Sequence, residues 1–190
     1  MLNVPTLPPK LEAVMVRLCK SVPLNKTQAV KLPYLVDVVA HRVLGRPISE
    51  GSHQAWDHGV VTSEAWHFLR ACSREPQQFD VQPVPSSEEE RISVSNDARD
   101  DALSEDEKRV VDYVIQEFSM LRAGELGPMT KLMNPEISTW GINRPADIGP
   151  DAFERMTDEY QDMAMDVART SLDYLRRYSV PVGSIEEAIA

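Results

Sequence analysis

Residues 30–68 read VKLPYLVDVVAHRVLGRPISEGSHQAWDHGVVTSEAWHF, and this stretch decides the fold of the chain. It contains two of the three tryptophans and three of the eight glycines among the 190 residues. Its pattern predicts a helix, a turn, a short β segment and a second helix. Because large amphipathic side chains are this dense, we expect the stretch to be a structural hub, a contact surface, or both.

The first helix of this stretch has clear start and stop signals. Asn25 and Gln28 form a capping-box pattern at its start, and Gly45 predicts a left-handed cap at its end. Pro33 falls eight residues past the cap, where proline costs about 3 kcal/mol in a straight helix. We therefore expect a kink at Pro33, or two helices with Pro33 near the start of the second. The residues expected to point inward are Leu32, Leu35, Val38 and Val39.

A short hairpin is predicted between Gly51 and Gly59, with its core at residues 54–56. A lone hairpin is marginally stable in water, so this one must pack on the helices, with Trp56 as its anchor. Two interpretations stay open for Trp56, a core residue or part of a partner-binding surface. His58 is either a surface contact or a hydrogen-bonded capping residue.

Three motifs in this stretch, and one further along, resemble the Panacea domain, the SocA-type antitoxin-associated family. They are Lys31-Leu32-Pro33-Tyr34-Leu35, Gly45-Arg46-Pro47-Ile48, Ala55-Trp56-Asp57-His58-Gly59-Val60-Val61, and Leu126-Gly127-Pro128-Met129-Thr130-Lys131 followed by Trp140. The resemblance spans about residues 10–140. The chain departs from the family pattern at Pro33, Val60 and Lys131.

The resemblance implies a mainly α domain with a small β-hairpin or short sheet packed on it. It implies an antitoxin that binds and neutralises a cognate toxin by direct contact, or delivers the toxin to a protease as an adaptor. It also implies that Thr130 and Trp140 fold back against Trp56. The residues expected to bind the partner are Tyr34, Trp56, His58, Trp66, Thr130, Lys131 and Trp140.

Composition limits the other function classes. The net charge of −10 argues against nonspecific nucleic-acid binding and suits a basic partner. No signal peptide or membrane span is recognisable, so we expect a soluble, cytoplasmic protein without membrane contact. Cys19 and Cys72 lie in apolar helical contexts and are expected to be buried free thiols.

No motif for catalysis or for a cofactor is recognisable. The spacing of His53, His58 and His67 fits no zinc motif, and the glycines form no phosphate-binding loop. We therefore expect no metal, no cofactor and no enzyme activity. Two further hypotheses stay open: a phage- or prophage-associated regulator or adaptor without a toxin partner, and a small hydrolase that uses His58 and a nearby carboxylate.

The rest of the chain divides by composition. We expect a domain over residues 8–145, which begins with a helix opened by Pro8 and Pro9. Within it, residues 73–103 are expected to be a mobile acidic loop in which 79–81 and 91–94 can pair as short strands. Ser104 and Glu107 form a second capping box. A long C-terminal helix is expected over 150–178, either packed on the core or joining two copies, and a loose tail over 179–190.

Overall fold

The computed structural model describes residues 5–76, 78–85, 89–137, 141, 144–149 and 151–155. Within them the chain forms five helices and six short strands named in sequence order. Their bounds are α1 Pro9–Ser21, β1 Leu24–Asn25, α2 Lys26–Leu44, β2 His53–Trp56, β3 Gly59–Thr62, α3 Ser63–Cys72, β4 Phe79–Pro83, β5 Glu90–Val94, α4 Glu105–Phe118, α5 Ala123–Leu132 and β6 Arg144–Pro145. A helical segment also covers 151–155.

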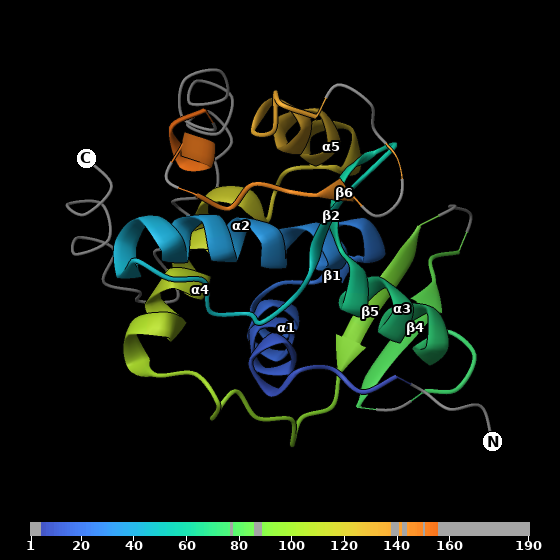
Figure 1. Cartoon of the computed structure of the whole chain (residues 1–190). Helices are drawn as coiled ribbons and strands as arrows, with labels where there is room; N and C mark the ends of the chain where they lie inside the picture. Colours follow the sequence, from blue (N-terminus) through green and yellow to red (C-terminus); the bar gives the residue numbers. More distant parts are fainter. Residues whose placement is uncertain are drawn as a thin grey trace.

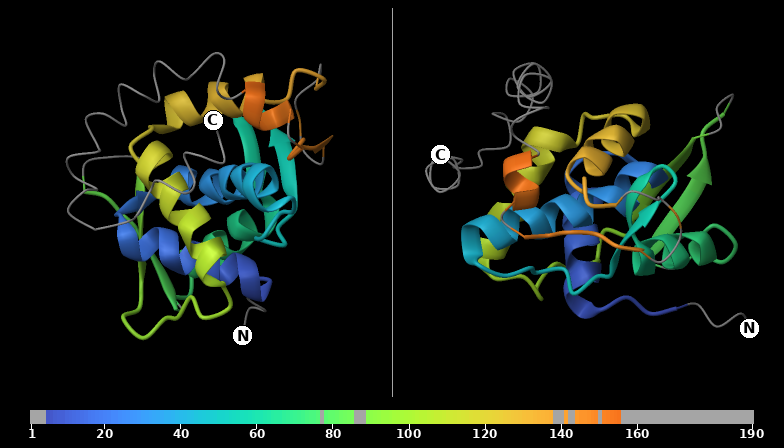
Figure 2. Two further views of the ribbon diagram at one scale, coloured as in Figure 1. Left: turned by 90° about the vertical axis from the view of Figure 1, so that its left-hand side faces the viewer. Right: turned by 45° about the horizontal axis from the view of Figure 1, so that its top comes forward.

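Helix α2 is the centre of the molecule. Residues 28–40 are all buried, as expected for a helix with protein on every side. Figures 1 and 2 show α1 and α5 on opposite sides of α2, which also contacts α3, α4 and strands β1, β3 and β5. Two charged residues, Lys31 and Asp37, lie inside this buried stretch and therefore need partners within the protein.

The predicted caps of α2 are confirmed. The side chain of Asn25 accepts a hydrogen bond from the Gln28 backbone N–H at 2.9 Å, and Gln28 reciprocates. Gly45 ends the helix at φ 71°. The helix runs without interruption through Pro33, so the two-helix alternative is wrong. Packing on every side of α2 compensates for the hydrogen bond that proline cannot donate.

A hairpin is present as predicted, with strands β2 and β3 paired antiparallel from His53↔Thr62 to Trp56↔Gly59, but its second strand begins at Gly59, where the predicted hairpin ended. Strand β6 adds to the other edge of β2, which makes a small sheet of three strands. Burial alternates along β2, so His53 and Ala55 face the core while Gln54 and Trp56 are partly exposed. Strand β2 therefore has one closed and one partly open face, whereas all four residues of β3 are buried.

The segment expected to be a mobile acidic loop contributes β4 and β5 to a second small sheet, in the order β1-β5-β4. The two weak alternating segments pair as predicted, with Val81 opposite Ile92. Phe79, at the start of β4, is fully buried and packs edge-on against Phe68, with ring centres 5.5 Å apart. Phe79 therefore anchors a segment whose polar composition is typical of a loop.

The predicted cap of α4 is also confirmed, since Ser104 and Glu107 exchange hydrogen bonds. The long helix expected over 150–178 and the tail over 179–190 lie almost entirely outside the described residues, and only 151–155 are seen to be helical. In the part of the chain that the structure describes, no helix is both long and apolar enough to cross a membrane.

Candidate partner-binding site

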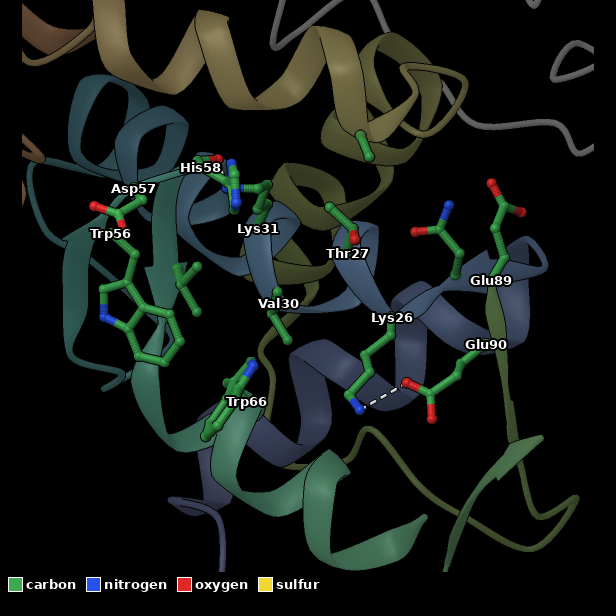
Figure 3. Close-up of a pocket in the computed structure, with 13 residues that line it drawn as sticks. Lys26, Thr27, Val30, Lys31, Trp56, Asp57, His58, Trp66, Glu89 and Glu90 are labelled. Carbon is green, nitrogen blue, oxygen red and sulfur yellow. Dashed lines mark hydrogen bonds and ion pairs between the residues drawn. The ribbon is translucent and has the colours of Figure 1, made fainter. Parts of the chain in front are cut away.

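A cavity of about 520 Å³ opens where the N-terminal half of α2 meets the β2–β3 turn and α3. Figure 3 shows Trp56 and Trp66 on one side of it, the ion pair of Lys26 and Glu90 on the other, and Lys31 between them. Val30 and Val61 complete an apolar wall. This volume lies in the range of ligand-binding pockets, roughly 300–1,000 Å³.

Trp56 and Trp66 form an aromatic pair at the edge of the cavity. Their ring centres lie 5.0 Å apart at an interplanar angle of 70°, the edge-to-face arrangement that aromatic pairs favour. The guanidinium carbon of Arg70 lies 5.1 Å from the centre of the Trp66 ring. Both indoles are only partly buried, so the pair presents a rigid aromatic surface to solvent.

Lys31 lies at the inner end of the cavity and is 2 % exposed. Its Nζ donates hydrogen bonds to the backbone carbonyls of His58, at 2.7 Å, and Val60, at 2.9 Å. Within the described residues no carboxylate pairs with it. Burial, together with the charge of Lys131, lowers the pKa of Lys31 to about 8.

The outer rim of the cavity carries mostly acidic groups. Lys26 and Glu90 are 2.7 Å apart and neutralise each other. Asp57 and Glu89 are exposed, and so is His58 at the tip of the hairpin. A negative rim therefore surrounds a cavity whose inner end holds a buried ammonium group.

Helix α5 fixes the hairpin turn from behind by direct backbone contact. Gly59 has φ 96°, and a Cβ there would lie 2.6 Å from the carbonyl oxygen of Gly127. Thr130 accepts a hydrogen bond from the Val60 N–H at 3.0 Å and donates one to the Gly127 carbonyl at 3.0 Å. Only glycine at positions 59 and 127 permits this close approach. The approach points the backbone carbonyls of His58 and Val60 at Lys31.

A buried polar network fixes the other end of the hairpin. Asp37 accepts hydrogen bonds from the backbone N–H groups of Ile48 and Ser49, both at 2.8 Å, and from the Ser49 hydroxyl. Its other main partner is His53 Nε2 at 2.7 Å, and His53 Nδ1 lies 3.0 Å from the Thr62 hydroxyl. Burial raises the pKa of Asp37, but the hydrogen bonds from His53 and Ser49 and the His53 charge outweigh it, so the pKa is lowered.

A family model for the antitoxin SocA-like, Panacea domain matches residues 30–135, more than half of the chain. The chain belongs to this family. Neither a search of curated proteins nor a search of solved structures returned a match. The match begins within α2, just before Lys31, and ends just after α5, so it covers Lys31, Asp37, the hairpin and both tryptophans, whereas the cavity residues 25–27 precede it.

Three of the predicted partner-binding residues of this Panacea domain lie together at the cavity. Trp56, His58 and Trp66 all line it and are all at least partly exposed. Lys131 is partly exposed on α5, and its charge acts on Lys31. A direct contact of these residues with a partner stays a prediction.

The other three predicted residues do not lie on the described surface. Tyr34 and Thr130 are fully buried, which corrects the expectation that their side chains contact a partner. Tyr34 accepts a hydrogen bond from Asn134 at 2.9 Å and donates one to the Asp147 carbonyl at 2.8 Å, so it holds the 144–149 segment on α2. Thr130 packs on the hairpin as the resemblance implied, whereas Trp140 lies outside the described residues.

Sequence reasoning missed Lys31 and Asp37 as the charges that organise the Panacea domain. In the sequence, Lys31 is only one residue of the 31–35 motif, and no pattern singles out Asp37. The available signal was the length of the apolar pattern: a helix that is apolar on every side must also bury any charge within it.

Proposed function

We propose that this Panacea-domain protein is an antitoxin that binds and neutralises a cognate toxin protein by direct contact at the cavity beside Trp56 and Trp66. The observation that carries the proposal is the partly exposed pair of Trp56, on a hairpin held from two sides, and Trp66, on the adjoining helix α3. Large aromatic residues next to a pocket are the anchors that dominate the binding energy of protein interfaces.

The rigidity of the hairpin favours tight binding. Asp37 and His53 hold one end of the hairpin, and Thr130 holds the turn. A surface that is already in its binding conformation loses little entropy when a partner docks. The tryptophans are therefore presented to a partner without a preceding rearrangement.

The charge of the protein fits a basic toxin. The whole chain carries −10, and Asp57 and Glu89 are exposed on the rim of the cavity. Opposite charges raise association rates and disfavour partners of the same sign. We expect the association rate to fall as salt is added, because exposed charges are screened over about 10 Å at 0.1 M ionic strength.

We also propose that the protein acts by binding, without catalysis. Within the described residues no hydrogen bond joins Asp57 to His58. The Asp37–His53 pair is inaccessible to a substrate, since both side chains are at most 3 % exposed. Ser49 donates its hydroxyl to Asp37 and not to His53, so these three residues are not arranged as a nucleophile with its base.

Co-expression with the product of the neighbouring gene tests the proposal. The neighbour alone should arrest growth, and this protein should restore growth and co-purify with the neighbour. Trp56→Ala should abolish rescue, whereas Leu132→Ala, an exposed apolar residue that does not line the cavity, should retain it. A harmless neighbour that does not co-purify would refute the antitoxin function and leave a regulator or adaptor with another partner.

The same experiment separates two ways of neutralising a toxin. Masking predicts a stoichiometric complex and a constant level of toxin in the cell. Delivery to a protease predicts that the toxin level falls when this protein is expressed and recovers when the protease gene is deleted. We expect masking, since the rigid face described above can cover a partner by itself.

A further inference from the structure

Lys31 is the one buried lysine among the described residues. Its ammonium group has three protons to donate, and two of them go to the carbonyls of His58 and Val60. Both acceptors are neutral. At 2 % exposure the side chain is removed from water, so its charge is poorly compensated within the protein.

The other buried charges in the structure are compensated. Glu107, with 1 % of its side chain exposed, pairs with Lys10 at 2.5 Å and with Arg46 at 2.9 Å. Asp37 has His53 beside it and accepts two backbone N–H groups. Lys31 alone among these borders a cavity while having no carboxylate partner within the described residues.

The apolar walls of the cavity indicate that its ligand also has an apolar group. Val30 and Val61 line it together with the tryptophan pair, so most of the surface around the inner end is apolar. A ligand that satisfies both features carries a carboxylate directly beside an apolar side chain. The last residue of a polypeptide has this combination, whereas aspartate or glutamate has a carboxylate but no apolar group of its own.

We propose that the cavity binds the C-terminal end of the partner protein, with its terminal carboxylate on Lys31 and its last, apolar side chain against Trp56 and Trp66. This inference rests on the proposed function, since it names the part of the toxin that enters the site. The acidic rim, with Asp57 and Glu89, faces the preceding residues and favours basic ones there.

Titration with small chain-end analogues tests the proposal without the toxin. The probe is N-acetylphenylalanine, and its comparison is N-acetylphenylalanine amide, which has the same ring but no carboxylate. Binding is followed through the indole N–H signals of Trp56 and Trp66 in two-dimensional NMR spectra. We expect the acid to bind at least about tenfold more tightly than the amide, the effect of one charge-assisted hydrogen bond.

Lys31→Gln should remove the preference for the acid while binding of the amide changes little. The matched control is Lys20→Gln, because Lys20 Nζ also donates to two backbone carbonyls, those of Asn96 and Ala98, at 3.0 and 2.7 Å, but lies outside the cavity. This control should keep the full preference. Unchanged indole signals in the unliganded variants show that the site is still folded.

Several outcomes overturn the proposal. They are equal affinity for acid and amide, no binding of either probe, and a preference that survives Lys31→Gln. N-acetylglutamic acid α-amide, which offers a side-chain carboxylate without an apolar group, should bind at least about tenfold more weakly than N-acetylphenylalanine. If it binds equally well, the site recognises acidic side chains and not a chain end.

The failure of this inference can be told apart from the failure of the antitoxin function. If this protein rescues growth but N-acetylphenylalanine is not preferred over its amide, the antitoxin function stands. The proposal that a chain end occupies the cavity is then wrong. If the neighbouring product is harmless but the acid is bound through Lys31, the chemistry of the site stands and its assignment to a toxin is wrong.

Discussion

Two buried charged residues on helix α2, Asp37 and Lys31, have opposite surroundings. Asp37 is enclosed by four hydrogen-bond donors from the 48–53 segment, all within 2.8 Å. Lys31, less than two helical turns away, has two neutral carbonyls and a cavity beside it. The Asp37 side of the hairpin is closed by the fold, whereas the Lys31 side is left open to a ligand.

The difference shows how the fold separates stability from binding. A buried charge with a complete set of partners holds its neighbours in one arrangement, and removing it leaves those partners unsatisfied. A buried charge with neutral partners costs stability in the unbound protein and gains a partner only when a ligand arrives. We therefore expect substitutions at the two sites to have effects of different size and kind.

The largest effect is expected for Asp37→Ala. The substitution leaves the N–H groups of Ile48 and Ser49 and the ring of His53 without their acceptor, so the free energy of unfolding should fall by roughly 3–5 kcal/mol. Urea denaturation followed by circular dichroism measures this loss. The control is Asp57→Ala on the exposed turn, which should change stability by no more than about 0.5 kcal/mol. Similar losses of unfolding free energy in the two variants would show that the hydrogen bonds of Asp37 do not stabilise the fold.

The next effect concerns the backbone contact that aims the turn carbonyls at Lys31. Gly59→Ala places a methyl group against Thr130 and Gly127 at φ 96°, so unfolding free energy should fall by about 3 kcal/mol. Gly45→Ala is the matched control, since Gly45 also has positive φ but nothing lies within 4 Å of its added methyl. That variant should lose only about 1 kcal/mol. Thermal denaturation of the pair separates backbone strain from the contact with α5.

A smaller change in the free energy of unfolding is expected when pH titrates Lys31. Its pKa is about 8 in the folded protein and 10.5 by reference in the unfolded chain, so the unfolded chain binds more protons between these values. Stability should therefore rise with pH through this window, by about 2 kcal/mol between pH 7 and pH 10.

The rise should appear as a difference between the wild type and Lys31→Met, because other groups titrate in both proteins. Lys20→Met serves as the control and should follow the wild type. Asp37 has a lowered pKa, so its contribution is present above the unfolded value of 3.8 and is lost as pH falls below it. If the pH profiles of Lys31→Met and the wild type coincide between pH 7 and pH 10, the ammonium of Lys31 is compensated after all.

The smallest effect on stability is expected for Trp56→Ala. Its ring is partly exposed, and its edge-to-face contact with Trp66 contributes about 1 kcal/mol beyond the apolar area that it buries against the core. Calorimetry should show a small decrease in melting temperature, while rescue of growth is lost. A large loss of stability would place Trp56 among the structural residues of the hairpin and would remove the basis for its role as a binding anchor.

Most of the local structure could be predicted from the sequence. The capping boxes at Asn25 and Ser104 and the hairpin between Gly51 and Gly59 follow from short-range rules, because each depends on backbone groups a few residues away. The 73–103 segment was harder, since burial of Phe79 depends on Phe68, which the polar composition of the segment does not reveal. Of the candidate site, the sequence predicts Trp56, His58 and Trp66, because all three lie in the 30–68 stretch.

By itself, the sequence determined the family, the start and end of α2, the starts of α1 and α4, and the presence of aromatic residues around one short hairpin. Only the tertiary structure decided which residues of that hub are buried and which are open. Tyr34 of the hub and Thr130 of α5 are buried, and Lys31 lies at a cavity. The reason is physical: burial of a polar group depends on partners far away in the sequence, such as Gly127 for the turn and Asn134 for Tyr34.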